Sequence, residues 1–512
     1  MNKCAYNLEL LILATARTPW QDYNEPIKKD SAANYIYQLK DTDIDTVMIC
    51  PTAWKRPLWP SKIDSHWTTD ATKLSQPLIG TDMKYHEKAY FRLREYMMQG
   101  NDPVDVAVKA AKETGIAPFI SYRMNDHHYL NQPDAFIHPA IWRNNPSFWI
   151  GDGDRHFDYI NQEVRDYYFS LLNELVDNYD IDGLELDFMR SPIYFHKNNL
   201  ADGIIVMTGF VRKIRNMLDE YGAKRNKRLS LCVRVPNTIE AALEIGLDVA
   251  TWDSEGLIDI INISSFFMNS PNLDIESYKN KTKNATLLGE MHFIIDSGEI
   301  YNGFKNNVSR KTTAQIYRSL AANYLDRGAD GVSMFNIDYT RHHFFNEPRR
   351  LKMKDGQPPT YAFRGITDPD YLSKCDKHYF VGPHYSTLPQ SNNLDIDLYV
   401  ADKTPADTFK HSILRLKTQR PCQPIDIATY INGVKLEEIS WLGELFAPIS
   451  NEALPRREFV KCFLVPTSII THGYNKITAV NTSGEIAGWD MEAIFDMVEL
   501  ALYKENSFLS AE

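Results

Sequence analysis

The chain has few cysteines, no excess of basic residues and no long apolar run. Its six cysteines are scattered over 512 residues, and no two have the spacing of metal ligands, so neither a zinc site nor a disulfide framework is indicated. The formal net charge of −11 argues against nucleic acid or an anionic membrane as the main partner, because both attract basic surfaces. No apolar stretch reaches the length that spans a bilayer.

A short apolar stretch near the N-terminus, residues 10–16, resembles the core of an export signal because it ends in an Ala-x-Ala pattern. The acidic residue Glu9 adjoins it and few basic residues precede it. We therefore expect this stretch to belong to the first strand of the fold rather than to a signal.

Strand-like and helix-like segments alternate through the first two thirds of the chain, which is long enough for a large barrel plus one accessory domain. Asp102 and Pro103 predict a helix start, and Gly115 predicts its end. This rhythm predicts parallel pairing with right-handed crossovers, and eight such repeats close a (β/α)8 barrel. The expected strands are 7–14, 45–51, 116–122, 181–190, 229–235, 258–263, 286–295 and 331–337.

The sequence changes character after about residue 360, where Pro, Asn and Asp become frequent. Short alternating runs separated by polar turns predict an antiparallel β-sandwich of the jelly-roll type. The predicted fold class is therefore α/β, with a barrel domain over residues 1–375 and a sandwich domain over 376–512. The runs that predict the sandwich are 396–400, 412–417, 425–431, 459–465, 475–481 and 497–503.

The most informative segment is the fourth expected strand, residues 181–190, where apolar residues alternate with Asp182, Glu185, Asp187 and Arg190. Burying unpaired charges is unfavourable, so such a strand is poorly suited to a plain core. At the C-terminal mouth of a barrel, however, these side chains face a site. The alternative is a network of ion pairs that closes the strand end.

Two carboxyl groups on different strands are the predicted catalytic pair, Asp187 and Glu290. We expect Asp187 to stay ionised between Arg190 and Arg123, which suits a nucleophile or base. Glu290 follows an apolar stretch, residues 286–289, that would raise its pKa for the role of acid. Glycoside cleavage needs two such carboxyls flanking the scissile bond.

Other carboxyls compete for these roles. Glu185 shares a strand face with Asp187, and if both point inward the like charges would raise the pKa of one of them. Asp182 begins the strand, so a structural hydrogen bond is its expected role. The competing carboxyls are Asp126, Glu185 and Asp338.

The remaining polar residues at the expected strand ends suit a polyhydroxylated ligand. Asp126, His127 and His292 could instead suggest a metal, but no His-x-His or His-Glu-x-x-His spacing is present, so neither a metal nor another cofactor is predicted. The predicted substrate-binding residues are Arg123, Asn125, Asp126, His127, Glu185, Arg190, Arg234, Asn336 and Asp338.

Three motifs carry a resemblance to a known group: residues 121–127 (SYRMNDH), 182–190 (DGLELDFMR), and 246–252 (GLDVATW) followed by 256–259 (GLID). They resemble the family-10-like glycosyl hydrolases, TIM barrels of polysaccharide-degrading bacteria, over most of residues 7–345. The resemblance implies a barrel glycosidase with a carbohydrate substrate. It also implies a bacterial protein exported to the periplasm or the medium, with its signal absent from this chain. A cytoplasmic location stays open.

The fourth-strand motif is also similar to the Asp-Gly-x-Asp-x-Asp-x-Glu signature of chitinase-like barrels, with one decisive departure. Met189 stands where that signature has its catalytic Glu, and Glu185 stands at its middle Asp. A substrate-assisted mechanism therefore lacks its acid here. We predict a glycoside hydrolase that cleaves O-glycosidic bonds in a polysaccharide or oligosaccharide. The alternatives are a non-catalytic carbohydrate-binding barrel and a metal-dependent hydrolase.

Overall fold

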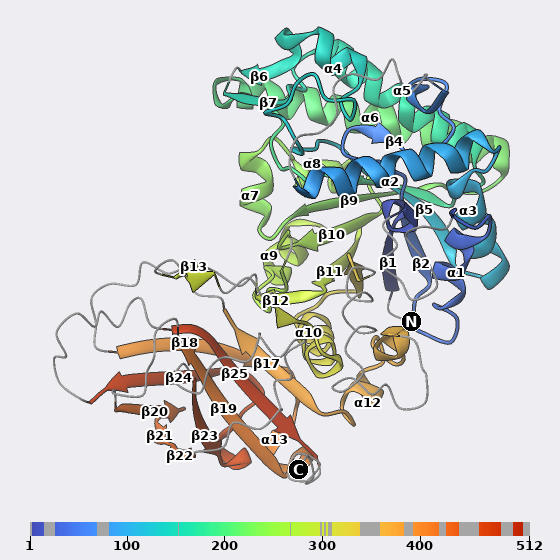
Figure 1. The fold of residues 1–512 in the computed structure, drawn as a ribbon. Coiled ribbons are helices and arrows are strands. Elements are labelled where there is room, and N and C mark those ends of the chain that lie inside the picture. The colour runs from blue at the N-terminus through green and yellow to red at the C-terminus, as the bar shows by residue number, and fades with distance from the viewer. Residues whose placement is uncertain are drawn as a thin grey trace.

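The computed structural model shows a barrel with a β-sandwich beside it (Figure 1). No helix in the described part of the chain is long and apolar enough to cross a membrane. The structure describes residues 3–14, 26–68, 81–151, 153–266, 268–296, 300–301, 304–305, 310–337, 359–382, 393–418, 426–439, 460–482 and 495–504.

Eight parallel strands form a closed barrel, which confirms the predicted fold class. The last strand pairs with the first, with Lys3 opposite Gly331. The strands are β1 (Lys3–Glu9), β2 (Thr46–Cys50), β5 (Ala117–Arg123), β8 (Gly183–Asp187), β9 (Ser230–Pro236), β10 (Ile260–Ser264), β11 (Thr286–His292) and β16 (Gly331–Phe335).

The first strand is displaced from the expected position. It ends at Glu9, and Leu10–Ala14 form a 3-10 helix (η1) whose five residues are all buried. A short run that is apolar throughout cannot be assigned to a strand or to a buried helical turn from its periodicity alone. This stretch is therefore part of the buried body of the barrel domain.

Helices surround the barrel, and α3 shows how the sequence sets their ends. Asp102 accepts hydrogen bonds from the backbone N–H of Val104 (2.9 Å) and of Asp105 (3.2 Å), Pro103 occupies the first turn, and Gly115 ends the helix at φ +74°. The predicted start and end are confirmed. The helices are α1 (Ser31–Tyr37), α2 (Thr81–Met98), α3 (Pro103–Thr114), α4 (Ala140–Asn144), α5 (Gln162–Asn178), α6 (Leu200–Arg225), α7 (Ile239–Glu244), α8 (Val249–Ser254), α9 (Ile275–Lys281), α10 (Ala314–Asp326) and α12 (Pro369–Leu372).

Short strand pairs lie in the loops of the barrel domain. One of them, β3 with β4, follows β2 directly and carries Lys55 in its turn. These pairs are β3 (Thr52–Ala53) with β4 (Arg56–Pro57), β6 (Trp149–Gly151) with β7 (Asp154–Phe157), β12 (Ile294–Asp296) with β15 (Arg310–Lys311), and β13 (Ile300–Tyr301) with β14 (Phe304–Lys305).

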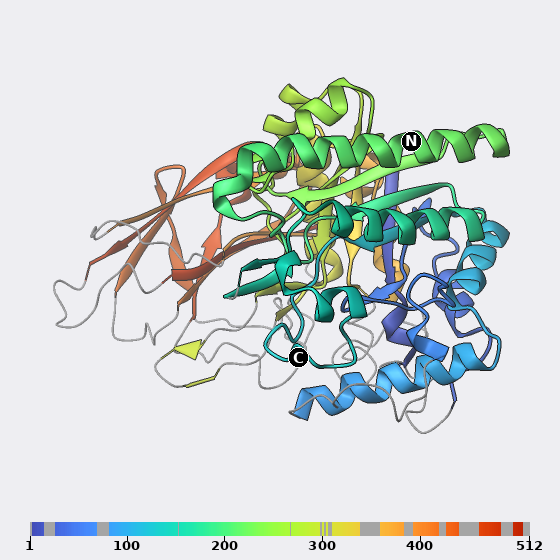
Figure 2. The ribbon, with the colours of Figure 1, turned by 90° about the horizontal axis from the view of Figure 1, so that it is seen from above.

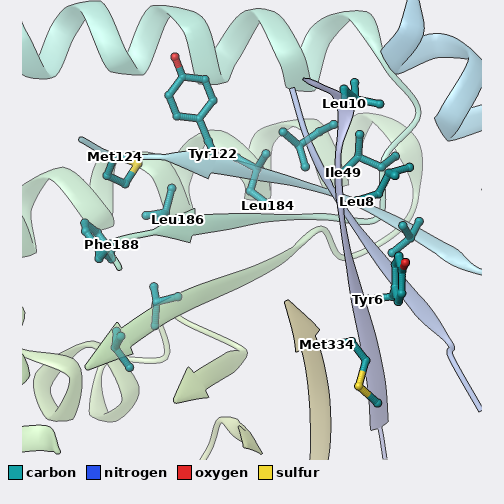
Figure 3. Packing of buried hydrophobic residues seen from close by; sticks show 14 of the residues in the cluster. Tyr6, Leu8, Leu10, Ile49, Tyr122, Met124, Leu184, Leu186, Phe188 and Met334 are labelled. Atoms are coloured by element: carbon teal, nitrogen blue, oxygen red, sulfur yellow. The ribbon is translucent and has the colours of Figure 1, made fainter. Parts of the chain in front are cut away.

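Alternate residues of each barrel strand face outward, and these pack against the helices as the main apolar core. Figure 3 shows part of this layer, with Tyr122 of β5 reaching toward the surrounding helices. Its ring lies 5.9 Å from that of Tyr168 on α5, edge to face. The outer layer thus fixes which residues of each strand point inward.

The inward-facing residues change from apolar to polar along the strands. Near the strand starts a separate apolar cluster contains Phe119, Cys232 and Leu288. Two residues further along the same strands stand Ser121, Arg234 and Glu290, each at most 1% exposed. Because the strands are parallel, their C-terminal ends meet at one mouth, so this polar layer lies directly beneath the mouth.

The C-terminal sandwich consists of two antiparallel sheets, which confirms its predicted class. Leu414 and Leu500 of one sheet share a buried cluster with Leu398 and Ile477 of the other. The boundary at residue 375 stays a prediction. One sheet has the order β17 (Lys377–Val381), β25 (Phe495–Tyr503), β19 (His411–Thr418), β23 (Val460–Val465) and β22 (Glu437–Ile439). The other has β18 (Asn393–Val400), β24 (Gly473–Asn481), β20 (Ile427–Ile431) and β21 (Val434–Lys435), and α13 (Pro405–Thr408) lies between strands.

The sandwich contacts the barrel through α10, and both views place it beside the barrel (Figures 1 and 2). The backbone N–H of His378 donates to Ser319 Oγ (2.6 Å), and Tyr399 donates to Asp326 (2.6 Å). On its other side α10 packs against β11, where Tyr324 would clash with any side chain at position 289. The sandwich therefore contacts α10, the helix that also packs against the site strand β11.

Candidate active site

Arg234 on β9 is the centre of a buried ion network beneath the mouth. Its Nε donates to Glu290 Oε2 (2.6 Å) and its Nη2 donates to Glu290 Oε1 (2.8 Å), a bidentate pair. Its Nη1 donates to Asp187 Oδ1 (2.8 Å), and Nη2 also contacts Ser264 Oγ (3.0 Å). Burial would lower the pKa of Arg234, but Asp187 and Glu290 raise it, so the guanidinium is charged. Arg234 was predicted to bind substrate; the structure shows it buried and hydrogen-bonded to both carboxylates, and a role in substrate binding stays a prediction.

Asp187 ends β8, and the hydrogen bonds to its carboxylate fall on one of the two oxygens. Oδ1 accepts from Arg234 Nη1, from the backbone N–H of Met189 (2.9 Å) and from that of Arg190 (3.2 Å). No residue in the described ranges donates to Oδ2. Three donors on one oxygen fix the direction of the carboxylate.

The cation partner of Asp187 differs from the expected one. Arg123 forms its ion pair with Glu9 on β1. Arg190 gives Asp187 its backbone N–H, while its guanidinium lies 3.0 Å from His128 Nε2. Arg123 lies opposite Asp187 in the register of β5 with β8, but the guanidinium bound to Asp187 is that of Arg234 on β9, so the expected cation partner is wrong.

Glu290 does not have the raised pKa expected of an acid. It is 0% exposed, Oε2 also accepts from Asn262 Nδ2 (3.1 Å), and His292 Nε2 lies 2.9 Å from Oε1. Burial alone would raise the pKa of Glu290, but Arg234 and His292 lower it to about 2. Burial acts in the expected direction, but the charges of Arg234 and His292 outweigh it, so the expected shift is wrong in sign.

Glu185 lies one layer below Asp187 on the same inward face of β8. Its Oε1 accepts from Ser121 Oγ (2.6 Å), and its Oε2 lies 3.2 Å from Asn262 Nδ2 and 3.5 Å from Cys232 Sγ. Burial, and then the like charge of Asp187, raise the pKa of Glu185 to about 7. The expected rise in the pKa of one member of this pair is confirmed.

Asp126 lies at the rim after β5, among positive groups. Its Oδ1 accepts from His128 Nδ1 (2.7 Å), while Oδ2 lies 3.8 Å from Arg123 Nη1 and 3.9 Å from Arg190 Nε. Burial would raise the pKa of Asp126, but His128, Lys55 and Arg190 lower it well below its usual range. Asp126 is therefore ionised at neutral pH and is unsuited to donate a proton.

Two neighbours of Asp126 have different surroundings. His127 is exposed and its Nδ1 lies 2.8 Å from Ser191 Oγ, and partial burial together with His128 lowers its pKa to about 4. Asn125 is buried and donates to the backbone carbonyls of Phe157 (3.1 Å) and Ile193 (2.8 Å). His127 is thus accessible to solvent, whereas Asn125 links two loops, and a role of either residue in binding substrate stays a prediction.

Two predicted residues follow β16. Asn336 adopts φ +56°, and its buried Oδ1 has no hydrogen-bond partner among the residues that the structure describes. A buried acceptor without a donor is unfavourable unless a ligand or water supplies one. Asp338 lies outside the described residues.

The residues of the metal alternative are not gathered. His292 faces Glu290, Asp126 pairs with His128, and His127 faces Ser191. Within the ranges that the structure describes, no three His, Cys, Asp or Glu side chains are placed to hold a metal ion.

Several site residues were missed from the sequence. Ser121 and Asn262 are polar residues flanked by apolar ones in β5 and β10, and that interruption was the signal for them; Glu9 ends β1, which also contains Lys3 and Asn7. Lys55 gave no such signal, because it lies in the turn of a strand pair. Its Nζ donates to the backbone carbonyl of Asp126, and burial lowers its pKa to about 8.

Comparisons with known proteins give structural matches alone, since no family model and no curated protein matches the chain. A chitinase of glycoside hydrolase family 18 from Chromobacterium violaceum has 8% identity and a TM-score of 0.40, covering 94% of this chain and 88% of that one. An α-L-fucosidase from Paenibacillus thiaminolyticus has 12% identity and a TM-score of 0.40, covering 72% and 49%. A glycoside hydrolase domain from Bordetella bronchiseptica has 9% and 0.39, covering 67% and 96%. At these TM-scores the similarity carries no argument about activity, so a function has to rest on the site itself.

Proposed function

We propose that the protein is a glycoside hydrolase acting on O-glycosidic bonds of a polysaccharide or oligosaccharide. The observation that carries the proposal is the carboxylate of Asp187 at the C-terminal end of β8, where Oδ1 accepts three hydrogen bonds and Oδ2 accepts none from the described residues. Such a group suits attack on an anomeric carbon or activation of a water. The resemblance to family-10-like barrels, and with it a bacterial and exported protein, agrees with this function and stays a prediction.

The second carboxyl of the reaction has to donate a proton to the leaving oxygen. Glu290 and Asp126 have lowered pKa values, and both oxygens of Glu185 are already hydrogen-bonded. Of the predicted pair, we therefore keep Asp187 for the chemistry and assign Glu290 to holding Arg234. Asp338, two residues beyond Asn336 at the end of β16, stays the sequence-based candidate for the acid.

The test is incubation of the protein with a panel of polysaccharides and oligosaccharides, followed by analysis of the products. We expect the wild type to release shorter sugars, and Asp187→Asn to release none at a measurable rate. Asp182→Asn is the matched control, because Asp182 lies at the opposite end of β8 in ion pairs with Lys112 (2.9 Å) and Lys227 (2.7 Å). Equal activity of Asp187→Asn and the wild type would refute the proposal.

A non-catalytic carbohydrate-binding barrel is the second candidate. It is favoured by one observation: among the described residues, no carboxyl at the mouth combines a raised pKa with an oxygen that lacks a hydrogen bond. Binding of a glycan without any cleavage in the same panel would establish this candidate in place of the first.

A further inference from the structure

The polar layer beneath the mouth holds more carboxyl groups than positive charges. Asp187, Glu185 and Glu290 share it with one guanidinium, that of Arg234. All the hydrogen bonds that Arg234 gives to carboxylates go to Asp187 and Glu290, and none goes to Glu185. Three ionised carboxylates around one cation in a buried layer would repel one another, so one of them is expected to hold a proton.

The contacts of Glu185 fit the protonated form. Its Oε1 faces the hydroxyl of Ser121, which can accept a hydrogen bond as well as donate one. Its Oε2 faces donors, the amide of Asn262 and the thiol of Cys232. A neutral carboxyl group that donates from Oε1 and accepts at Oε2 satisfies every one of these contacts without a cation.

The titratable groups around Glu185, taken together with its burial, also favour the protonated form. Asp187 on its own strand and Glu290 on β11 raise its pKa, Arg234 on β9 opposes them, and burial adds the largest rise, giving a value of about 7. Cys232 on β9 stays a neutral thiol, because burial and Glu185 raise its pKa. The faces contributed by β5 and β10 carry no further titratable group in contact with it.

We propose that Glu185 is a positioning residue that holds a proton in the active form of the site, and that its ionisation sets the upper pH limit of activity. The inference rests on the proposed function. When Glu185 releases its proton to solvent, a second negative charge stands beside Asp187. That charge competes for Arg234, which orients the Asp187 carboxylate. The neutral form keeps Arg234 on Asp187 and Glu290.

The first readout is folding stability against pH, which needs no activity. Glu185→Gln mimics the neutral form, because the amide nitrogen can donate to Ser121 and the oxygen can accept from Asn262. Glu185 has a raised folded pKa, so it stabilises the fold below about 4.5, and this contribution is lost as pH rises toward 7. The folding equilibrium constant of the wild type, relative to the Gln variant, should fall about tenfold per pH unit between about 5 and 7, then stay level. Parallel pH profiles would overturn the proposal whatever the activity.

The second readout is the pH dependence of kcat on a substrate found in the panel. Wild-type kcat should fall about tenfold per pH unit above about 7, whereas that of Glu185→Gln should change little from pH 6 to 9. Asp182→Asn should keep the wild-type profile. An unchanged basic limb in Glu185→Gln would overturn the positioning role. A wild type inactive on every substrate would refute the proposed function, and the stability profiles would still decide whether Glu185 holds the proton.

If Glu185→Gln does not fold, the infrared difference spectrum of the wild type between pH 6 and 8 shows whether Glu185 holds a proton. Loss of a protonated-carboxyl C=O band with a midpoint near pH 7 supports the proposal. The absence of such a band overturns it.

Discussion

Replacing Arg234 by methionine tests the buried ion network most sharply. Glu290 has an ordinary pKa of 4.5 and a folded pKa of about 2, because Arg234 and His292 together outweigh burial. That shift corresponds to about 3 kcal/mol at 1.36 kcal/mol per unit, and breaking a buried ion pair costs about 3–5 kcal/mol. Because the folded pKa is the lower one, this stabilisation is present above pH 4.5 and is lost as pH falls through about 2.

We therefore expect Arg234→Met to unfold at lower urea concentration at pH 7, with a free energy of unfolding about 3 kcal/mol or more below that of the wild type. The difference should narrow as pH falls from about 4.5 toward 2. The double variant Arg234→Met/Glu290→Gln should recover part of the loss, since it no longer leaves Glu290 as an unpaired buried charge. Circular dichroism during urea titration measures all three proteins. Equal stability of Arg234→Met and the wild type at pH 7 would refute the assigned role of Arg234.

Three further predictions concern the site and its support. Asp187→Asn should lower the hydrolysis rate by several orders of magnitude, and it should also lower the free energy of unfolding by about 3–5 kcal/mol, because it removes one charge of the buried ion pair with Arg234; full activity of the variant would contradict this. Asp102→Ala should cost about 1 kcal/mol through the lost N-cap of α3, measured by thermal melting, and an unchanged Tm would count against it. Gly289→Ala should destabilise the barrel more than Asp102→Ala does, because its Cβ would lie 2.4 Å from the ring of Tyr324. Comparison of the two melting curves checks that order.

The barrel could be predicted because its signal is local and repeated. Apolar strands alternate with amphipathic helices such as α5, and parallel strands need such crossovers, so the pattern specifies the class of fold. The end of β1 could not be placed, since residues 10–14 are apolar throughout and lack the period that separates a strand from a 3-10 helix.

The site was predicted as a set of polar residues at strand ends, but its pairing was not. Arg234 and Asp187 are 47 residues apart, and their contact depends on the register of β8 with β9. The sign of the Glu290 pKa shift failed for the same reason, because its neighbours in space come from other strands. The shared face of Glu185 and Asp187 was predictable, because two residues of one strand need no tertiary register.

The central claim is that Asp187 acts at the anomeric carbon, and chemical rescue of Asp187→Gly tests it most directly. The measurement is the hydrolysis of an aryl glycoside of the sugar identified in the panel, with and without sodium azide. The account predicts that the variant is inactive alone and that azide restores turnover, with a glycosyl azide as the product, because the small anion occupies the place of the missing carboxylate. Hydrolysis by Asp187→Gly at the wild-type rate in the absence of azide would contradict the account.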